Sequence, residues 1–197
     1  MGTRNLTCVV LGGKFRIAQY GQWDGYPEGQ GTVVLDFLKN KMDRERFETA
    51  LKQTKWITQE ELRQLYDDVG ADGSGLISMD IANKFQSLHP QLDRDMAAEV
   101  LEFVQKADGP VLLNDEHEFA NDGLFCEWAY VIDLDNDKLE VYSGFREEAP
   151  PESNRFGSEV GENGYAAVGL VKAYDLNDLP DEETFIKELT PRDEDDE

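Results

Sequence analysis

Alternating apolar and polar positions occur near both ends of the chain. The run LTCVVLGGKFRIAQY, residues 6–20, alternates on either side of two adjacent glycines, and this pattern predicts a β-hairpin. The run FCEWAYVIDLDNDKLEVYSGF, residues 125–145, alternates around a DND turn and predicts a second hairpin. YAAVGLVKAYDL, residues 165–176, predicts one further strand. We therefore expect both ends of the chain to supply strands.

The middle of the chain has the apolar spacing of helices. Thr32 is expected to cap a helix with Val34, Leu35 and Leu38 on its apolar face. Asp43 and the capping box TQEE, residues 58–61, predict the starts of two more helices. SMDIANKFQSLHP and LDRDMAAEVLEFVQKADG predict helical segments that a proline and a glycine end, and PDEETFIKEL predicts a short closing helix.

These elements predict one α+β domain over residues 1–190. Its sheet is expected to be mainly antiparallel, formed by the amino-terminal and carboxy-terminal hairpins, with a central helical block. GADGSG, residues 70–75, predicts a turn between two helices, and residues 146–164 predict a long exposed loop. The like-charged residues 191–197 predict a disordered acidic tail.

Length and composition place the protein among soluble globular chains. It has 197 residues, 40% of them hydrophobic, and no apolar run approaches the length of a membrane span. No charged and apolar leader opens the chain, so a cytoplasmic location is expected. Cys8 and Cys126 lie in apolar strand-like runs, which predicts two buried free thiols.

The charge is uneven along the chain. Residues 1–55 carry nine basic and six acidic groups, whereas residues 111–197 carry six basic and 25 acidic groups. An acidic surface repels phosphate backbones, so direct nucleic-acid binding is disfavoured. Two interpretations remain open: a solvated acidic face, or a surface that mimics nucleic acid and docks on a basic partner.

Several patterns that resemble known sites lack essential residues, so no metal or cofactor is predicted. The run that starts at Asp133 lacks the central glycine and final glutamate of a calcium loop, and the run GADGSGLISMDI lacks charged ligands at both ends. GQGTVV lacks the third glycine of a dinucleotide fingerprint and the lysine of a P-loop. His89 and His117 have no metal-ligand spacing, and no GxSxG elbow is present.

The segment YGQWDGYPEGQG, residues 20–31, is the strongest candidate site. Its aromatics could plug the end of a sheet while its glycines permit turns, which is the structural interpretation. Its aromatic and polar side chains also alternate as the lining of a binding pocket does. The predicted ligand-binding residues are Tyr20, Gln22, Trp23, Asp24, Tyr26, Glu28 and Gln30.

Catalytic candidates come from the opposite strand of the first hairpin. Thr3 and Arg4 begin that strand, and a two-residue turn brings strand ends together, so either residue could lie beside Asp24. The candidates are therefore Thr3, Arg4 and Asp24.

Four stretches resemble a family of uncharacterised bacteriophage and prophage proteins. They are MGTRNLTCVV, IAQYGQWDGYPEGQGTVVLDFL, SMDIANKFQSLHPQLDRDMAAEVL and EWAYVIDLDNDKLEVY, and a more distant fungal group has a similar opening. The resemblance implies a phage accessory protein in the host-cell cytoplasm, with inhibition of a host defence protein as one role. The aromatic and polar cluster of residues 20–31, the acidic second half and the lack of a standard catalytic set favour a non-enzymatic protein that binds a small ligand or a host factor.

The order of strands in the first hairpin also resembles that of amino-terminal nucleophile hydrolases. Those enzymes use a terminal Cys, Ser or Thr whose free amine acts as base. Removal of Met1 exposes Gly2 here, and Thr3 would need one further cleavage. An amide-cleaving hydrolase and an acidic nucleic-acid mimic are thus the two alternative functions.

Overall fold

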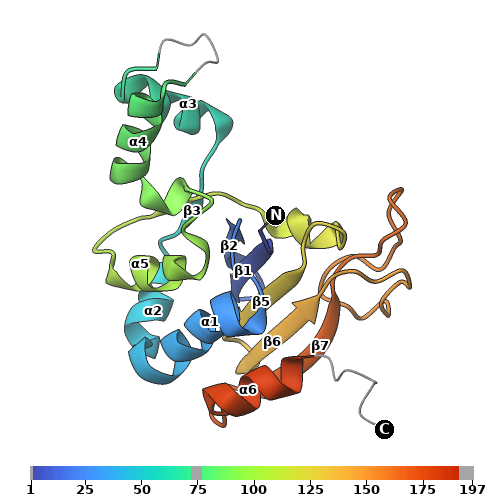
Figure 1. Cartoon of the computed structure of the whole chain (residues 1–197). Helices are drawn as coiled ribbons and strands as arrows, with labels where there is room; N and C mark the ends of the chain where they lie inside the picture. Colours follow the sequence, from blue (N-terminus) through green and yellow to red (C-terminus); the bar gives the residue numbers. More distant parts are fainter. Residues whose placement is uncertain (1, 72–76, 191–197) are drawn as a thin grey trace, which may run out of the picture.

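A five-stranded sheet with the order β2-β1-β5-β6-β7 forms the centre of the protein (Figure 1). The computed structural model describes residues 2–71 and 77–190. The strands of the sheet are β1 (Asn5–Val10), β2 (Phe15–Gly21), β5 (Trp128–Asp133), β6 (Lys138–Ser143) and β7 (Gly169–Asp175). β1 and β5 are parallel and the other neighbours are antiparallel. The predicted α+β fold is confirmed, and the β1–β5 pair joins the two ends of the chain.

Both predicted hairpins are present. Gly12 and Gly13 have φ values of 66° and 68°, the left-handed region that a tight two-residue turn requires. The second turn is held by the Asp133 carboxylate, which accepts hydrogen bonds from the backbone N–H groups of Asp135 (3.1 Å) and Asn136 (3.0 Å). The calcium-like run is therefore a hairpin turn.

The described residues form six α-helices and several shorter helical turns, most of which connect strands, whereas the last helix follows the last strand. The helices are α1 (Thr32–Asp36), α2 (Arg44–Leu51), α3 (Gln59–Asp68), α4 (Met79–Leu88), α5 (Val100–Lys106) and α6 (Glu182–Leu189). Asp43 caps α2 and Thr58 caps α3 through a capping box, as predicted. The turns η3 (Pro90–Leu92), η4 (Ala97–Glu99) and η5 (His117–Asn121) and the two-residue strands β3 (Lys55–Trp56) and β4 (Leu112–Leu113) complete the fold.

The predicted cap at Thr32 is wrong. The chain becomes helical five residues earlier, in the turn η1 (Pro27–Gly31), and it continues through α1 into the turn η2 (Phe37–Lys41). Pro27 stands at the first helical position, where its fixed φ is favourable and its missing N–H costs nothing. The Thr32 hydroxyl instead donates to the Gly29 carbonyl at 2.8 Å, inside the helical segment.

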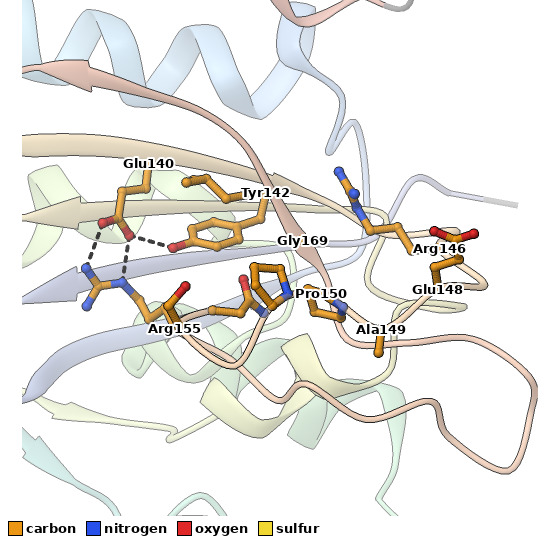
Figure 2. A pocket seen from close by; sticks show the side chains of 12 residues that line it. Glu140, Tyr142, Arg146, Glu148, Ala149, Pro150, Arg155 and Gly169 are labelled. Atoms are coloured by element: carbon orange, nitrogen blue, oxygen red, sulfur yellow. Dashed lines mark hydrogen bonds and ion pairs between the residues drawn. The ribbon is translucent and has the colours of Figure 1, made fainter.

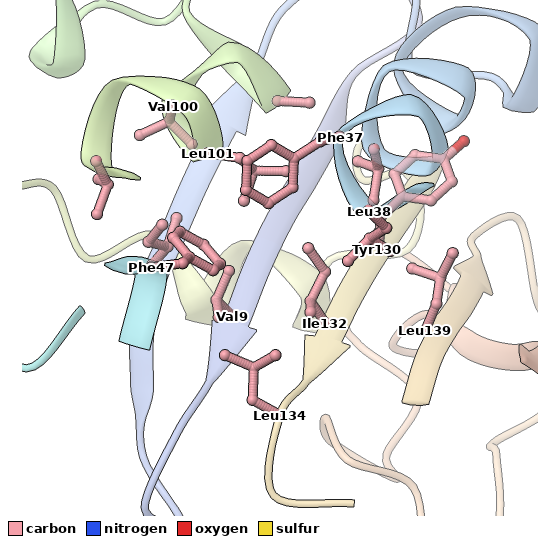
Figure 3. Close-up of a cluster of buried hydrophobic side chains, with 14 of the residues drawn as sticks. Val9, Phe37, Leu38, Phe47, Val100, Leu101, Tyr130, Ile132, Leu134 and Leu139 are labelled. Atoms are coloured by element: carbon pink, nitrogen blue, oxygen red, sulfur yellow. The ribbon is translucent and has the colours of Figure 1, made fainter. Parts of the chain in front are cut away.

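Apolar side chains cover both faces of the sheet. On one face Phe37, Phe47 and Leu101 from the helical block meet Val9 and Ile132 from the sheet (Figure 3). The opposite face has a second core, whose members are Leu6, Cys8, Val10, Ala18, Ala120, Cys126, Ala129, Val131, Tyr142, Phe156, Ala167 and Val168. Helices α3 and α4 project away from the sheet and have a small apolar cluster of their own (Figure 1).

The two cysteines are buried and free, as predicted. Burial raises the pKa of the Cys8 and Cys126 thiols well above its ordinary value, so both thiols are uncharged at neutral pH. Within the described ranges, every helix is too short or too polar to traverse a lipid bilayer. The predicted acidic tail and residues 72–75 of the GADGSG turn lie outside the described residues.

Candidate functional site

The segment Tyr20–Gly31 runs from the last residues of β2 into η1, beside the start of β1. Its backbone is held by hydrogen bonds from side chains of the sheet. The side-chain amide of Asn5 donates to the carbonyls of Gly21 and Trp23, both at 3.3 Å. The buried Tyr130 hydroxyl donates to the Gly25 carbonyl at 2.8 Å. Gly21 is the β-ladder partner of Asn5, so this anchoring belongs to the sheet itself.

Glycine is required at two positions because other backbone atoms approach closely. A Cβ atom on Gly25 would lie 2.7 Å from both the Asn5 Cβ and the Thr3 carbonyl oxygen. A Cβ atom on Gly29 would lie 2.1 Å from the Asp24 carbonyl oxygen, and that oxygen accepts a 2.7 Å hydrogen bond from the Gln30 N–H. The backbone of the segment therefore has a packing role.

Four of its side chains are exposed, although the Trp23 ring also packs closely against Gly2. Trp23 is 50% exposed and Tyr26 is 41% exposed, and Asp24 and Glu28 are also exposed. Asp24 has a φ of 53°, an uncommon conformation for a residue other than glycine. The Tyr26 hydroxyl donates to the Asp24 carboxylate at 3.1 Å, and this hydrogen bond raises the pKa of Tyr26. The four side chains form a surface that we call the aromatic–acidic platform.

The other three predicted ligand-binding residues do not join the platform. Tyr20 packs edge-on against Phe119, with ring centroids 4.9 Å apart, and its hydroxyl donates to the Gln22 side chain at 2.7 Å. Gln30 accepts a hydrogen bond from the Ala98 N–H at 3.1 Å, so it links η1 to η4. These contacts assign Tyr20, Gln22 and Gln30 to packing.

The catalytic candidates have neighbouring backbones but separate side chains. Gly25 N–H donates to the Thr3 carbonyl at 2.9 Å, which places the start of the chain beside Asp24 as expected. The Arg4 guanidinium instead lies over the Phe125 ring, 4.7 Å from its centroid. Among the described residues, neither Thr3 nor Arg4 forms a side-chain hydrogen bond or ion pair with Asp24. Thr3, Arg4 and Asp24 are therefore not assembled into a catalytic set.

Strands β1 and β2 carry a buried cluster of polar side chains next to the segment Tyr20–Gly31. Asn5, Thr7 and Gln19 are at most 2% exposed, and Thr7 stands directly opposite Gln19 in the β1–β2 pair. The Asn5 Oδ1, Thr7 Oγ1 and Gln19 Oε1 atoms have no hydrogen-bond partner among the described residues. Sequence reasoning missed this cluster, although polar residues at the inward positions of an alternating strand were a visible signal.

The segment around η4 covers the polar cluster. The Gln19 side-chain amide donates to the Asp93 carbonyl at 3.0 Å. A Cβ atom on Gly21 would lie 2.6 Å from Asn5 Oδ1 and 2.8 Å from the Ala97 Cβ, so Asn5 fills the space beside Ala97. Ala97 has a φ of 42°, a second strained position next to this end of the sheet.

A cavity of about 660 Å³ lies toward the opposite edge of the sheet, between β6, the start of β7 and the loop of residues 146–155 (Figure 2). Arg155 closes one end of it. Its guanidinium binds both Glu140 oxygens, at 2.6 Å and 2.8 Å, and it also binds the Asp133 carboxylate at 2.5 Å. The Tyr142 hydroxyl donates to Glu140 at 2.7 Å.

The charges at this end of the cavity stabilise one another. The hydrogen bonds to Glu140 raise the pKa of Arg155 further. Burial by itself raises the pKa of Asp133, but the hydrogen bonds from Asn136 and Arg155 outweigh burial and hold that pKa below its ordinary value. The guanidinium is thus occupied by protein carboxylates, and this end of the cavity has a structural role.

No metal centre is visible in the described ranges. Residues 2–71 and 77–190 contain no group of three His, Cys, Asp or Glu side chains arranged to hold a metal ion. His117 binds Asp115 at 2.7 Å and stacks on Phe15. Part of the calcium-like run from Gly70 to Ile81 lies outside the described residues.

No protein-family model, no curated protein and no solved structure matches the chain significantly.

Proposed function

We propose that the protein is a non-enzymatic binding protein that recognises a partner protein through the aromatic–acidic platform. The observation that carries the proposal is the half-exposed Trp23 on a backbone that Asn5 and Tyr130 fasten to the sheet. Exposed Trp and Tyr side chains on a rigid support are typical of binding hot spots, because little conformational entropy is lost when they are covered.

The charges of the platform favour a cationic partner. Asp24 and Glu28 are exposed near the Tyr26 ring, and a Lys or Arg side chain can contact an aromatic face and a carboxylate together. The net charge of −23 would also speed the encounter with a basic protein. The phage resemblance makes a host protein in the host cytoplasm the proposed partner, with counter-defence as the proposed role.

Capture of partners on the immobilised full chain tests this proposal. We compare the wild type, Trp23→Ala and Leu88→Ala, since Leu88 is an equally exposed apolar side chain on α4, at 58%. A bacterial protein that binds the wild type and Leu88→Ala but not Trp23→Ala supports the platform. Identical bound proteins on wild type and a folded Trp23→Ala chain would contradict it.

Two alternatives are separated by simple measurements. A nucleic-acid mimic would bind its partner through the acidic second half of the chain, so that partner would leave at high salt and would bind a folded Trp23→Ala chain as well as the wild type. The hydrolase alternative needs a chain that begins at Thr3. An intact mass that corresponds to a start at Met1 or Gly2 excludes it.

A second candidate function is the binding of a small polar molecule beneath the platform. The unpartnered oxygens of Asn5, Thr7 and Gln19 favour it, because each buried polar atom without a partner costs about 1–3 kcal/mol. Native mass spectrometry of the full chain tests it. Extra mass that disappears on denaturation, and in a folded Thr7→Val chain, supports a bound molecule; the bare protein mass argues for a structural cluster.

A further inference from the structure

The two edge strands of the sheet differ in how their outer edges are covered. The outer edge of β2 is occupied: the Ala18 carbonyl accepts from the Glu116 N–H at 3.1 Å, and the Arg16 carbonyl accepts from the Thr54 hydroxyl at 3.1 Å. Within residues 2–71 and 77–190, β7 pairs with β6 alone. An uncovered edge offers backbone N–H and C=O groups to another strand, and most proteins protect such edges.

The ladder identifies which β7 groups are free. Leu176 N–H donates to the Asp137 carbonyl at 2.9 Å, so this pair is hydrogen-bonded directly across the two strands. Along two antiparallel strands, residue pairs that are hydrogen-bonded to each other alternate with pairs that are not. Ala173 stands opposite Glu140, three positions from the Leu176–Asp137 pair, and so belongs to a pair that is not hydrogen-bonded. The N–H and C=O of Ala173 therefore point away from β6. No group of the described residues hydrogen-bonds the Ala173 backbone from that side.

The side chains along β7 are also uncovered. Leu170 is 50% exposed and Val171 is 39% exposed, and Ala173 is exposed as well. On the opposite face of the strand, Lys172 is engaged by Glu188 of α6 at 2.7 Å and Tyr174 is buried. The face that carries Val171 and Ala173 thus has no layer over it.

The cavity described above lies at the start of this strand. Leu170 and Gly169 line it together with Tyr142 and Pro150 (Figure 2). A Cβ atom on Gly169 would lie 2.6 Å from the Arg146 Nε, so the glycine lets Arg146 lie close to the strand. A peptide added to β7 would place alternate side chains over this face, one of them at the cavity.

The charged side chains around β7 indicate what kind of extended segment could pair with this strand. The nearby cations Lys138, Lys172 and Arg155 are already paired with carboxylates of the chain. Arg146, which lines the cavity, donates to the Ser143 carbonyl and forms no ion pair with another described residue. The exposed loop carboxylates Glu148 and Glu152 form no ion pair with another described residue. A second copy of this acidic chain would be repelled, whereas an extended segment that carries Lys or Arg would be attracted.

We propose that β7 accepts an extended basic segment of a partner protein as a sixth strand, with an apolar side chain of that segment seated in the cavity beside Leu170. This inference rests on the sheet edge and does not depend on the platform. Main-chain hydrogen bonds would supply affinity, while the cavity and the acidic rim would supply specificity.

Selection of displayed random octapeptides on the full-length chain provides the probe. We expect the enriched peptides to alternate apolar residues with Lys or Arg. Ala173→Pro removes the outward N–H without removing a β6 bond, and Val171→Lys repels a basic strand. Each change should weaken peptide binding at least tenfold. Val160→Lys is the matched control, because Val160 is an equally exposed valine, at 45%, on the long loop.

The outcomes separate this proposal from the platform. Enriched peptides that bind Trp23→Ala as well as the wild type, and that slow amide exchange at Ala173, support the edge site. If no peptide is enriched, or if the enriched peptides bind folded Val171→Lys and Ala173→Pro chains with wild-type affinity, the edge proposal is overturned. Peptides that lose affinity only for Trp23→Ala overturn it too, and assign the binding to the platform.

Discussion

The segment Tyr20–Gly31 and the loop of residues 146–155 are both irregular connections rich in glycine or proline, but they are held in different ways. The first is held by neutral hydrogen bonds from Asn5 and Tyr130 and by close backbone packing at its glycines. The second is held by Arg155, a single guanidinium between two carboxylates.

The two segments therefore use their charged side chains differently: one exposes them, and the other uses Arg155 to stabilise the fold. Neutral anchoring at the platform leaves the charges of Asp24 and Glu28 free for a partner. At the second loop Arg155 is paired with Asp133 and Glu140, and its removal would leave the buried Asp133 carboxylate without a counter-charge. Perturbations of charge should therefore affect the second loop, and perturbations of packing should affect the first.

Arg155→Ala should produce the largest loss of stability. The Asp133 side chain is 2% exposed and would lose its counter-charge, which predicts a loss of about 3–5 kcal/mol in the free energy of unfolding. Urea unfolding measures the change. Arg46→Ala is the control: its ion pair with Asp108 is long, at 3.8 Å, and exposed, so a shift within about 0.5 kcal/mol is expected. Equal losses in the two variants would contradict the claim that the buried Arg155 ion pair stabilises the protein more than an exposed ion pair does.

Gly29→Ala should be the most damaging change within the platform segment. Its new Cβ would overlap the Asp24 carbonyl oxygen, a backbone atom that has little freedom to move. Overpacking predicts a loss of about 1–3 kcal/mol. Gly109→Ala has open space around the new Cβ and should change stability by less than about 0.5 kcal/mol. A Gly29→Ala chain as stable as the wild type would mean that the segment is not tightly packed.

Tyr130→Phe isolates one anchoring hydrogen bond. The Gly25 carbonyl would remain buried without its donor, which predicts a loss of about 1–2 kcal/mol by thermal or urea unfolding. The loss should be the same at pH 4 and pH 7, since burial raises the pKa of Tyr130 and its hydroxyl is neutral at both.

Acid should weaken the second loop selectively. The pKa of Asp133 in the folded protein is lower than its ordinary value of 3.8. The ionised carboxylate therefore stabilises the fold at pH values above 3.8. That contribution is lost as the pH falls through the lower folded value. Wild-type stability should therefore decline faster than that of Arg155→Ala between pH 5 and pH 2, as measured by urea unfolding. Parallel declines would contradict the assignment.

Trp23→Ala should have the smallest effect on stability. Half of the side chain is exposed, so we expect a change of less than about 1 kcal/mol in the free energy of unfolding. A loss as large as that of Gly29→Ala would return Trp23 to a structural role.

The sheet could be predicted from sequence because its hairpins depend on local signals. The two glycines after Leu11 and the DND turn specify where the strands reverse, and Asp43 and Thr58 mark helix starts by their own side-chain hydrogen bonds. Thr32 was mistaken for a cap although Pro27, a residue favoured at the first helical position, was a local signal of the earlier start.

The candidate site was only partly predictable because the positions of its side chains depend on contacts between residues far apart in the sequence. The composition of Tyr20–Gly31 identified the segment, but it could not separate exposed Trp23 from Gln30, whose partner Ala98 is far along the chain. The pairing of Arg155 with Asp133 and Glu140 likewise joins residues that no local pattern connects. Such long-range contacts arise only in the folded chain.

The accessibility of Trp23 tests the central claim most directly. In a Trp56→Phe, Trp128→Phe chain, Trp23 is the single tryptophan, and its fluorescence can be quenched with acrylamide before and after a captured partner is added. The platform predicts strong quenching in the free protein and protection in the complex. A shielded Trp23 in the free protein, or equal quenching in the complex, would contradict it.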